Sequence, residues 1–139
     1  MTVPPSWRVT EAILARFRDA VRADGADFLV LSLSNGIQVD PDPAVRAAYA
    51  RAMGVPDLGH PERRLAARLR EIDVPHLMLA PALAREAERT GQCLHGFENA
   101  EPCRGHWNEA GHAAAGRLLA ERLCAGFARG ELGGRGSGS

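Results

Sequence analysis

The stretch that says most about the fold of this chain is Gly105-His106-Trp107-Asn108-Glu109-Ala110-Gly111-His112. Asn108 is a good N-cap residue and Glu109 suits the positive end of a helix dipole, so we expect a helix from here to Phe127. His106 comes shortly before the cap and therefore lies on the loop that leads into this helix. Imidazole titrates near neutral pH, so a histidine on such a loop is suited to act as a general base.

Upstream of this helix, capping residues and apolar runs predict alternating helices and strands. Thr10 is the expected N-cap of a first helix that ends at Gly25, and the apolar run 26–33 predicts a strand buried on both faces. A second buried strand is expected at 75–80. Further helices are expected to begin at Asp42-Pro43, at His60-Pro61 and at Pro81.

This alternation predicts an α/β fold in which helices cover a parallel sheet through right-handed crossovers. Only two strands are predicted, whereas sheets usually contain about four to six. The sheet is therefore expected to be truncated, with apolar surface and an unpaired edge that need a partner. We expect the chain to self-associate or to bind an upstream half-domain.

The composition is typical of one globular domain, since the 139 residues are 45% hydrophobic and 24% charged. The 17 basic and 17 acidic residues cancel, so we expect no binding of nucleic acid or of an anionic membrane surface. The sequence has no apolar run of the roughly 20 residues that span a bilayer and no signal peptide, so a cytoplasmic location is expected. All basic residues are arginine, which we interpret as the bias of a GC-rich, bacterial coding sequence.

The expected domain boundaries follow from these elements. Residues 1–9 are expected to be an N-terminal extension, and residues 10–128 to form the α/β domain. Residues 129–139 are expected to be a disordered tail, because the sequence from Gly133 onward consists mostly of glycine and serine and offers little that can pack.

His106-Trp107-Asn108, followed by Gly111-His112, resembles the C-terminal block of the SGNH (GDSL-type) hydrolases. The resemblance implies a three-layer α/β/α, flavodoxin-like fold and an ester hydrolase that works through a serine acyl-enzyme. It implies His106 as the general base, a small ester or an acylated carbohydrate as substrate, and no need for a metal or an organic cofactor. Within the block, Gly111 is expected to let the helix backbone approach a neighbour closely, and His112 is expected to be structural.

The chain departs from the pattern of these enzymes in its nucleophile and its acid. It contains no Gly-Asp-Ser and no Gly-x-Asn-Asp or Gly-x-Asn-Glu, and the positions where the acid is expected hold Cys103 and Arg104. The remaining candidates are Ser34, at the end of the first predicted strand, as nucleophile and Glu101 as the acid that orients His106. Because a base needs a nucleophile and an oxyanion hole, we expect the chain alone to hydrolyse activated esters very weakly.

Two other interpretations stay open from the sequence. One is a non-catalytic binding or structural domain with the same fold. The other is a small zinc module built from Cys93, His95, Cys103 and His106, a set of two thiolates and two imidazoles that suits tetrahedral zinc. The two cysteines are expected to be reduced in a cytoplasmic chain, with a disulfide as the alternative in an oxidising compartment. Cys124 is expected to be a core residue of the closing helix.

Overall fold

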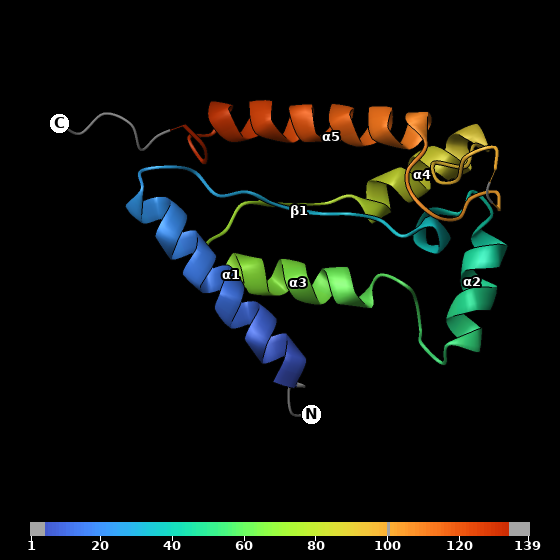
Figure 1. The fold of residues 1–139 in the computed structure, drawn as a ribbon, viewed down its shortest axis with the longest axis horizontal. Coiled ribbons are helices and arrows are strands. Elements are labelled where there is room, and N and C mark those ends of the chain that lie inside the picture. The colour runs from blue at the N-terminus through green and yellow to red at the C-terminus, as the bar shows by residue number, and fades with distance from the viewer. Residues whose placement is uncertain (1–4, 100, 134–139) are drawn as a thin grey trace.

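A computed structural model describes residues 5–99 and 101–133 of the chain. Helices dominate the fold, and a short parallel sheet runs through its middle (Figure 1). In chain order the elements are α1 (Pro5–Ala23), β1 (Val30–Ser32), the 3-10 helix η1 (Gly36–Val39), α2 (Pro43–Ala52), α3 (His60–Glu71), β2 (His76–Met78), α4 (Ala80–Thr90) and α5 (Glu109–Ala128). None of the helices in these ranges is both long enough and apolar enough to cross a bilayer.

The sheet consists of β1 and β2, which run parallel to each other. Their register pairs Val30 with His76, Leu31 with Leu77 and Ser32 with Met78. Three helices, α2, α3 and the short η1, lie between the two strands along the chain. The prediction of a mixed α/β fold with two parallel strands is therefore confirmed.

Helices cover both faces of this sheet (Figure 1). Successive side chains of a strand point to opposite faces, so each strand contributes to two separate apolar clusters. On one face, Leu31 and Leu77 pack with residues of α4 and α5. On the other face, Val30 and Met78 pack with α1 and with the buried Leu69 of α3. The sheet is thus the middle layer of a helix–sheet–helix arrangement.

Both strands are shorter than the sequence predicts. The expected strands cover 26–33 and 75–80, but only the three residues of β1 and of β2 pair, and these are half-buried rather than fully buried. Each strand has a single neighbour within the described residues, so no further strand extends the sheet there. Of the remaining apolar residues, Phe28 packs against helices and Leu33 is exposed. Apolarity alone therefore overestimated the length of both strands.

The first helix begins earlier than its predicted cap. α1 starts at Pro5, so residues 5–9 belong to the helix and not to an N-terminal extension, while 1–4 lie outside the described residues. Thr10 sits inside the helix, where its hydroxyl donates to the Ser6 carbonyl 3.1 Å away. A threonine satisfies its hydroxyl on the preceding helical turn as readily as at a cap, so the residue type did not fix the boundary.

The chain just after α5 is folded, in contrast to the tail predicted over 129–139. Leu132 is buried and lies against Gly126 of the closing helix. An apolar side chain that the sequence places beyond the last helix therefore still packs onto it. The rest of the predicted tail, 134–139, lies outside the described residues.

The closing helix α5 forms where the sequence predicts it. The Asn108 side chain accepts a hydrogen bond from the Gly111 N–H at 3.0 Å, which confirms Asn108 as the N-cap. The expected close approach at Gly111 is also confirmed, because a Cβ atom here would overlap the carbonyl oxygen of Leu94. Cys124, predicted to be a core residue, is exposed, and the buried side of α5 consists of alanine and glycine instead.

We predict opposite effects for two glycine-to-alanine substitutions in α5. Gly111→Ala forces a methyl group against the Leu94 carbonyl, so the free energy of unfolding should fall by about 1–3 kcal/mol. Gly116→Ala, the control, meets open space in the same helix and should raise the free energy of unfolding by about 0.5–1 kcal/mol, because alanine favours helix more than glycine does. Urea unfolding measures both. Equal effects of the two substitutions would contradict the close packing of α5 at Gly111.

Candidate functional site

The loop between α4 and α5, residues 91–108, folds into two arms that lie alongside each other. The arms meet at an isolated antiparallel bridge between His95 and Trp107. Next to this bridge, the Gly96 N–H donates to the His106 carbonyl at 2.9 Å. We refer to this segment as the 91–108 loop. Backbone hydrogen bonds between residues of 91–99 and 101–108 therefore hold the two arms together.

Three side chains connect the 91–108 loop to the end of β1. Ser34 comes shortly after β1 and therefore lies at the carboxyl end of the sheet. Its Oγ lies 3.0 Å from His95 Nε2, and the Trp107 Nε1–H donates to the same Oγ at 2.8 Å. His95 Nδ1 lies 2.8 Å from the Gly105 carbonyl oxygen. We call Ser34, His95 and Trp107 the serine–histidine network.

The chemistry of these groups fixes where the protons are. A carbonyl oxygen can only accept, so His95 carries its proton on Nδ1 and donates it to Gly105, and the Ser34 hydroxyl donates to Nε2. Burial of the His95 ring, which is 3% exposed, lowers its pKa below the usual 6.5. The hydrogen bond to Gly105 opposes this shift, and the nearby His106 adds to it. The imidazole is therefore neutral at pH 7.

A serine hydroxyl that donates to a neutral, oriented histidine has the arrangement of a nucleophile and its base. Two backbone N–H groups close to Ser34 are already used, however. The Asn35 N–H donates to Gln38 Oε1 at 2.8 Å, and the Ile37 N–H donates to Asn35 Oδ1 at 3.4 Å. These bonds form the capping box of η1, so neither N–H is free to stabilise an oxyanion.

His106, the base predicted from the sequence, lies on the outer side of the 91–108 loop. Its backbone carbonyl is held by Gly96, whereas its side chain is exposed and makes no hydrogen bond within the described residues. In the sequence it stands between Gly105, whose carbonyl accepts from His95, and Trp107, which donates to Ser34. The structure therefore places His106 beside the serine–histidine network, with its ring directed away from the core.

Glu101, the acid predicted to orient the base, does not take that role among the described residues. Its side chain is exposed and bonds to neither His95 nor His106, and its backbone carbonyl accepts from the Arg104 N–H at 3.2 Å. The orienting acceptor of His95 is the Gly105 carbonyl instead. A neutral carbonyl stabilises a charged imidazolium less than a carboxylate does, so this histidine is held in place more than it is activated.

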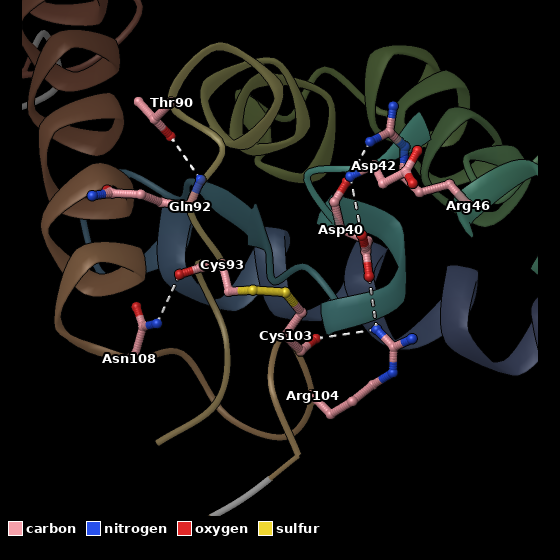
Figure 2. The surroundings of a disulfide bond; sticks show 9 residues. All are labelled: Asp40, Asp42, Arg46, Thr90, Gln92, Cys93, Cys103, Arg104 and Asn108. Carbon is pink, nitrogen blue, oxygen red and sulfur yellow. Dashed lines mark hydrogen bonds and ion pairs between the residues drawn. A yellow bond between two sulfur atoms is a disulfide. The ribbon is translucent and has the colours of Figure 1, made fainter. Parts of the chain in front are cut away.

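Figure 2 shows the Cys93–Cys103 disulfide, which joins the two arms of the 91–108 loop with Cα atoms 4.8 Å apart. The Cys93 carbonyl accepts from the Asn108 side chain at 2.8 Å, which links the disulfide to the start of α5. On the other side, Arg104 forms an ion pair with the buried Asp40 at 3.1 Å, just after η1. The disulfide is thereby connected to two separate elements of the fold.

The disulfide overturns two expectations from the sequence. Cys93 and Cys103 are not a reduced pair, because the two arms bring their Cα atoms within disulfide range. Zinc binds thiolates, so the bonded sulfurs are not ligands, and the zinc module that also included His95 and His106 is wrong. Across 5–99 and 101–133, the structure contains no group of three or more histidine, cysteine, aspartate or glutamate side chains that could hold a metal ion.

The sequence did not indicate the serine–histidine network. Ser34 and His95 are 61 positions apart, and no spacing rule joins residues at that separation. A local signal was present in Gly36, where a Cβ atom would overlap the Cys103 carbonyl oxygen. A glycine shortly after the end of a strand can mark the place where a distant loop packs, but it does not say which loop.

We predict that the stability of the protein depends on the protonation of His95. The unfolded chain binds a proton on an ordinary imidazole below pH 6.5, whereas the folded state resists protonation because the His95 pKa is lowered. The free energy of unfolding should therefore fall as the pH drops below about 6.5 and should level off below the folded pKa. Urea unfolding between pH 5 and 8 measures this.

The matched variants for this experiment are His95→Gln and His60→Gln, since His60 is exposed at the start of α3. His95→Gln should remove most of the loss of stability between pH 6.5 and 5, and His60→Gln should retain it. A pH dependence that is unchanged in His95→Gln would show that the ring is not buried and neutral as described.

We predict that the disulfide stabilises the folded protein. Its removal in the double variant Cys93→Ala/Cys103→Ala should lower the free energy of unfolding by about 2–3 kcal/mol, as expected for a short closed loop. Cys124→Ala is the control, because this thiol is exposed and free, and should change the stability by less than about 0.5 kcal/mol. A double variant as stable as the control would mean that the bond does not constrain the loop.

No protein-family model, no curated protein and no solved structure matches this chain.

Proposed function

We propose that this chain carries the general-base side of an SGNH-type ester hydrolase site, with His106 as the base. The observation that supports this most is the position of His106. Its ring is exposed, while its backbone is fixed by Gly96 on a loop that is itself bonded to Ser34 at the carboxyl end of β1. Ligands of open α/β sheets bind at this edge. We also propose that the domain belongs to the flavodoxin-like fold class, since helices lie on both faces of its parallel sheet.

His95 is a positioning residue in this proposal. Both of its ring nitrogens are engaged, one with Gly105 and one with Ser34, and the ring is buried. A base has to exchange protons with a nucleophile and a leaving group, which requires one nitrogen that can reach the substrate. His106 meets this requirement better than His95, because its ring is exposed.

The proposed reaction is hydrolysis of a small ester or of an acylated carbohydrate. His106 takes the proton of a serine hydroxyl as its oxygen attacks the carbonyl carbon, and then passes the proton to the departing alcohol. Water releases the acyl group from the serine in a second, equivalent step. This mechanism requires no metal or organic cofactor.

The nucleophilic serine of this site is proposed to come from a further polypeptide segment. Ser34 fits the role poorly as the partner of His106, because its hydroxyl donates to His95 and its oxygen accepts from Trp107. β1 and β2 each have a single neighbour within the described residues, so a segment bearing the serine could add a strand beside one of them.

A second candidate is hydrolysis by Ser34 and His95 within this chain. The 3.0 Å contact between Ser34 Oγ and His95 Nε2, together with the neutral state of the ring, favours this pair. The occupied N–H groups of Asn35 and Ile37 count against it, because losing one oxyanion donor typically costs about 10²–10³ in turnover. A third candidate is a non-catalytic domain, in which the same network only holds the 91–108 loop.

We predict that a fluorophosphonate probe, which modifies activated serines, leaves the chain unmodified in intact-mass spectrometry. Hydrolysis of nitrophenyl acetate should be slow and equal in the wild type, Ser34→Ala and His95→Ala, because the Asn35 and Ile37 N–H groups near Ser34 are engaged in the capping box. Modification at Ser34, with turnover lost in both variants, would establish Ser34 and His95 as the catalytic pair and overturn the assignment to His106.

A fusion separates the first proposal from the non-catalytic domain. The serine-bearing half of an SGNH hydrolase, joined ahead of α1, should restore ester hydrolysis, and His106→Ala should lower kcat by about 10²–10⁴. His112→Ala is the control and should retain most of kcat. The ring of His112 contacts Trp107, with centroids 5.5 Å apart, and takes no part in the proposed proton transfer. A fusion that is folded by circular dichroism but whose activity does not depend on His106 would contradict the proposal.

We also propose that the isolated chain self-associates. The strands have unpaired edges within the described residues, and α1 exposes Val9, Ile13 and Phe17 along one side at helical spacing. Sedimentation equilibrium at micromolar concentration should show dimers or larger species. Phe17→Glu should shift the equilibrium toward monomer, while Arg16→Glu, at the neighbouring position, should not. A stable wild-type monomer would count against this.

The disulfide leads us to propose an oxidising compartment in place of the cytoplasm expected from the sequence. Disulfides persist in secreted and periplasmic proteins and are rare in the cytosol, where thiols are kept reduced. The Cys93–Cys103 bond lies between the two arms that carry His95 and Trp107. A compartment that keeps this bond oxidised therefore also keeps the proposed site in place.

A further inference from the structure

A pocket of about 300 Å³ lies between η1, α2, α3 and α4. This volume is at the lower end of the range for small-molecule sites. Its walls are mainly small apolar residues, among them Ala47, Ala50, Ala80 and Ala84. β2 ends just before Ala80, so the pocket opens near the carboxyl end of the sheet. Such a pocket suits a ligand with a compact apolar body.

One acidic side chain of this pocket lacks a complete set of partners. Glu62, in the first turn of α3, lines the pocket and is only 8% exposed. Its Oε1 accepts a hydrogen bond from the Ser32 hydroxyl at 2.7 Å. Its Oε2 is buried and has no hydrogen-bond partner in the part of the chain that the structure describes. A buried carboxylate oxygen without a donor destabilises the folded state, and a ligand that supplies the donor removes this destabilisation.

The other polar residues of the pocket are already paired. Gln38 Nε2 donates to the Leu58 carbonyl at 3.1 Å. Both oxygens of Asp57 bind the Arg63 guanidinium, at 2.7 and 2.8 Å. Arg46 donates to the Asp40 carbonyl and to the Glu88 carboxylate, both of which lie outside the pocket lining. Among the described residues, Glu62 is thus the charged lining residue whose only side-chain hydrogen bond comes from a hydroxyl group.

We infer that this pocket binds a small organic cation, a primary ammonium group on a compact apolar body. The ammonium donates to Glu62 and neutralises its charge, and the apolar body packs against the alanines. Oε2 lies beneath the pocket surface, so the carboxylate turns about its terminal side-chain bond to meet the ligand, a torsion that is soft in glutamate. This inference concerns a site separate from His106 and does not depend on the proposed hydrolysis.

Titration with cyclohexylammonium chloride, followed by ¹H–¹⁵N NMR at pH 7, tests this on the whole chain. Cyclohexylammonium should shift the amide signals of η1 and of the first turn of α3 in a saturable manner below about 10 mM. Cyclohexanol has a similar shape but no charge, so it should bind about tenfold or more weakly, as expected for the loss of a charge-assisted hydrogen bond. Equal binding of both compounds, or binding of neither, would overturn the inference.

Two variants and one control assign the binding to Glu62. Glu62→Gln should weaken cyclohexylammonium binding by about tenfold or more, whereas Glu71→Gln, at the exposed end of the same helix, should not. If Glu62→Gln does not fold, Ala47→Leu provides the test, because Ala47 is exposed at the pocket and leucine should occupy the space of the ligand. Undiminished binding in Ala47→Leu, or in a folded Glu62→Gln, would exclude this pocket as the site.

Discussion

The two hydrogen bonds of the His95 ring are the interaction on which the rest of the site depends. One bond holds the 91–108 loop together internally, through Gly105, and the other attaches the loop to Ser34 at the end of β1. A buried imidazole can do both only in one tautomer, since it must donate through one nitrogen and accept through the other. The ring thus converts a long loop into a fixed part of the sheet edge, and the place of His106 follows from it.

Close backbone contacts support the same arrangement on both sides of the loop. Gly111 lets α5 approach the Leu94 carbonyl, and Gly36 lets η1 approach the Cys103 carbonyl. The disulfide between Cys93 and Cys103 closes the loop between these two contacts. A sheet of two three-residue strands offers little surface for packing, and these contacts add long-range connections that the sheet does not provide. The site and the stability of the fold therefore depend on the same segment.

The sequence predicted those features whose causes are local. The Asn108 cap, the Asp42 cap of α2 and the close approach at Gly111 each follow from a residue type at a defined position in or beside a helix. The start of α1 was wrong because Thr10 bonds within its own helix. The strand lengths were wrong because the extent of pairing is set by the neighbouring strand and not by the apolarity of the run. The helix ends were thus more predictable than the extent of the sheet.

The site was predictable only in part, for a related reason. His106 could be proposed from the sequence because it lies two residues before Asn108, the helix cap that identifies its loop, and its role as a base stays a prediction. His95, by contrast, acquires its role from Ser34 and from burial, and both are consequences of tertiary packing. Glu62 has no sequence signal for the same reason, because its proposed role comes from the missing partner of one oxygen and not from a motif.

The serine–histidine network fixes the 91–108 loop to the sheet edge through a bond from the Trp107 indole N–H to Ser34. The exchange of this indole proton with solvent is the most direct test. Trp7 is an internal reference, since its ring lies under the Arg64 guanidinium at 4.7 Å and its N–H forms no hydrogen bond within the described residues. NMR-detected hydrogen exchange should show the Trp107 indole proton exchanging much more slowly than that of Trp7, and this protection should be lost in Ser34→Ala and in His95→Ala. Equally fast exchange of the two indoles in the wild type would show that the network does not hold the loop.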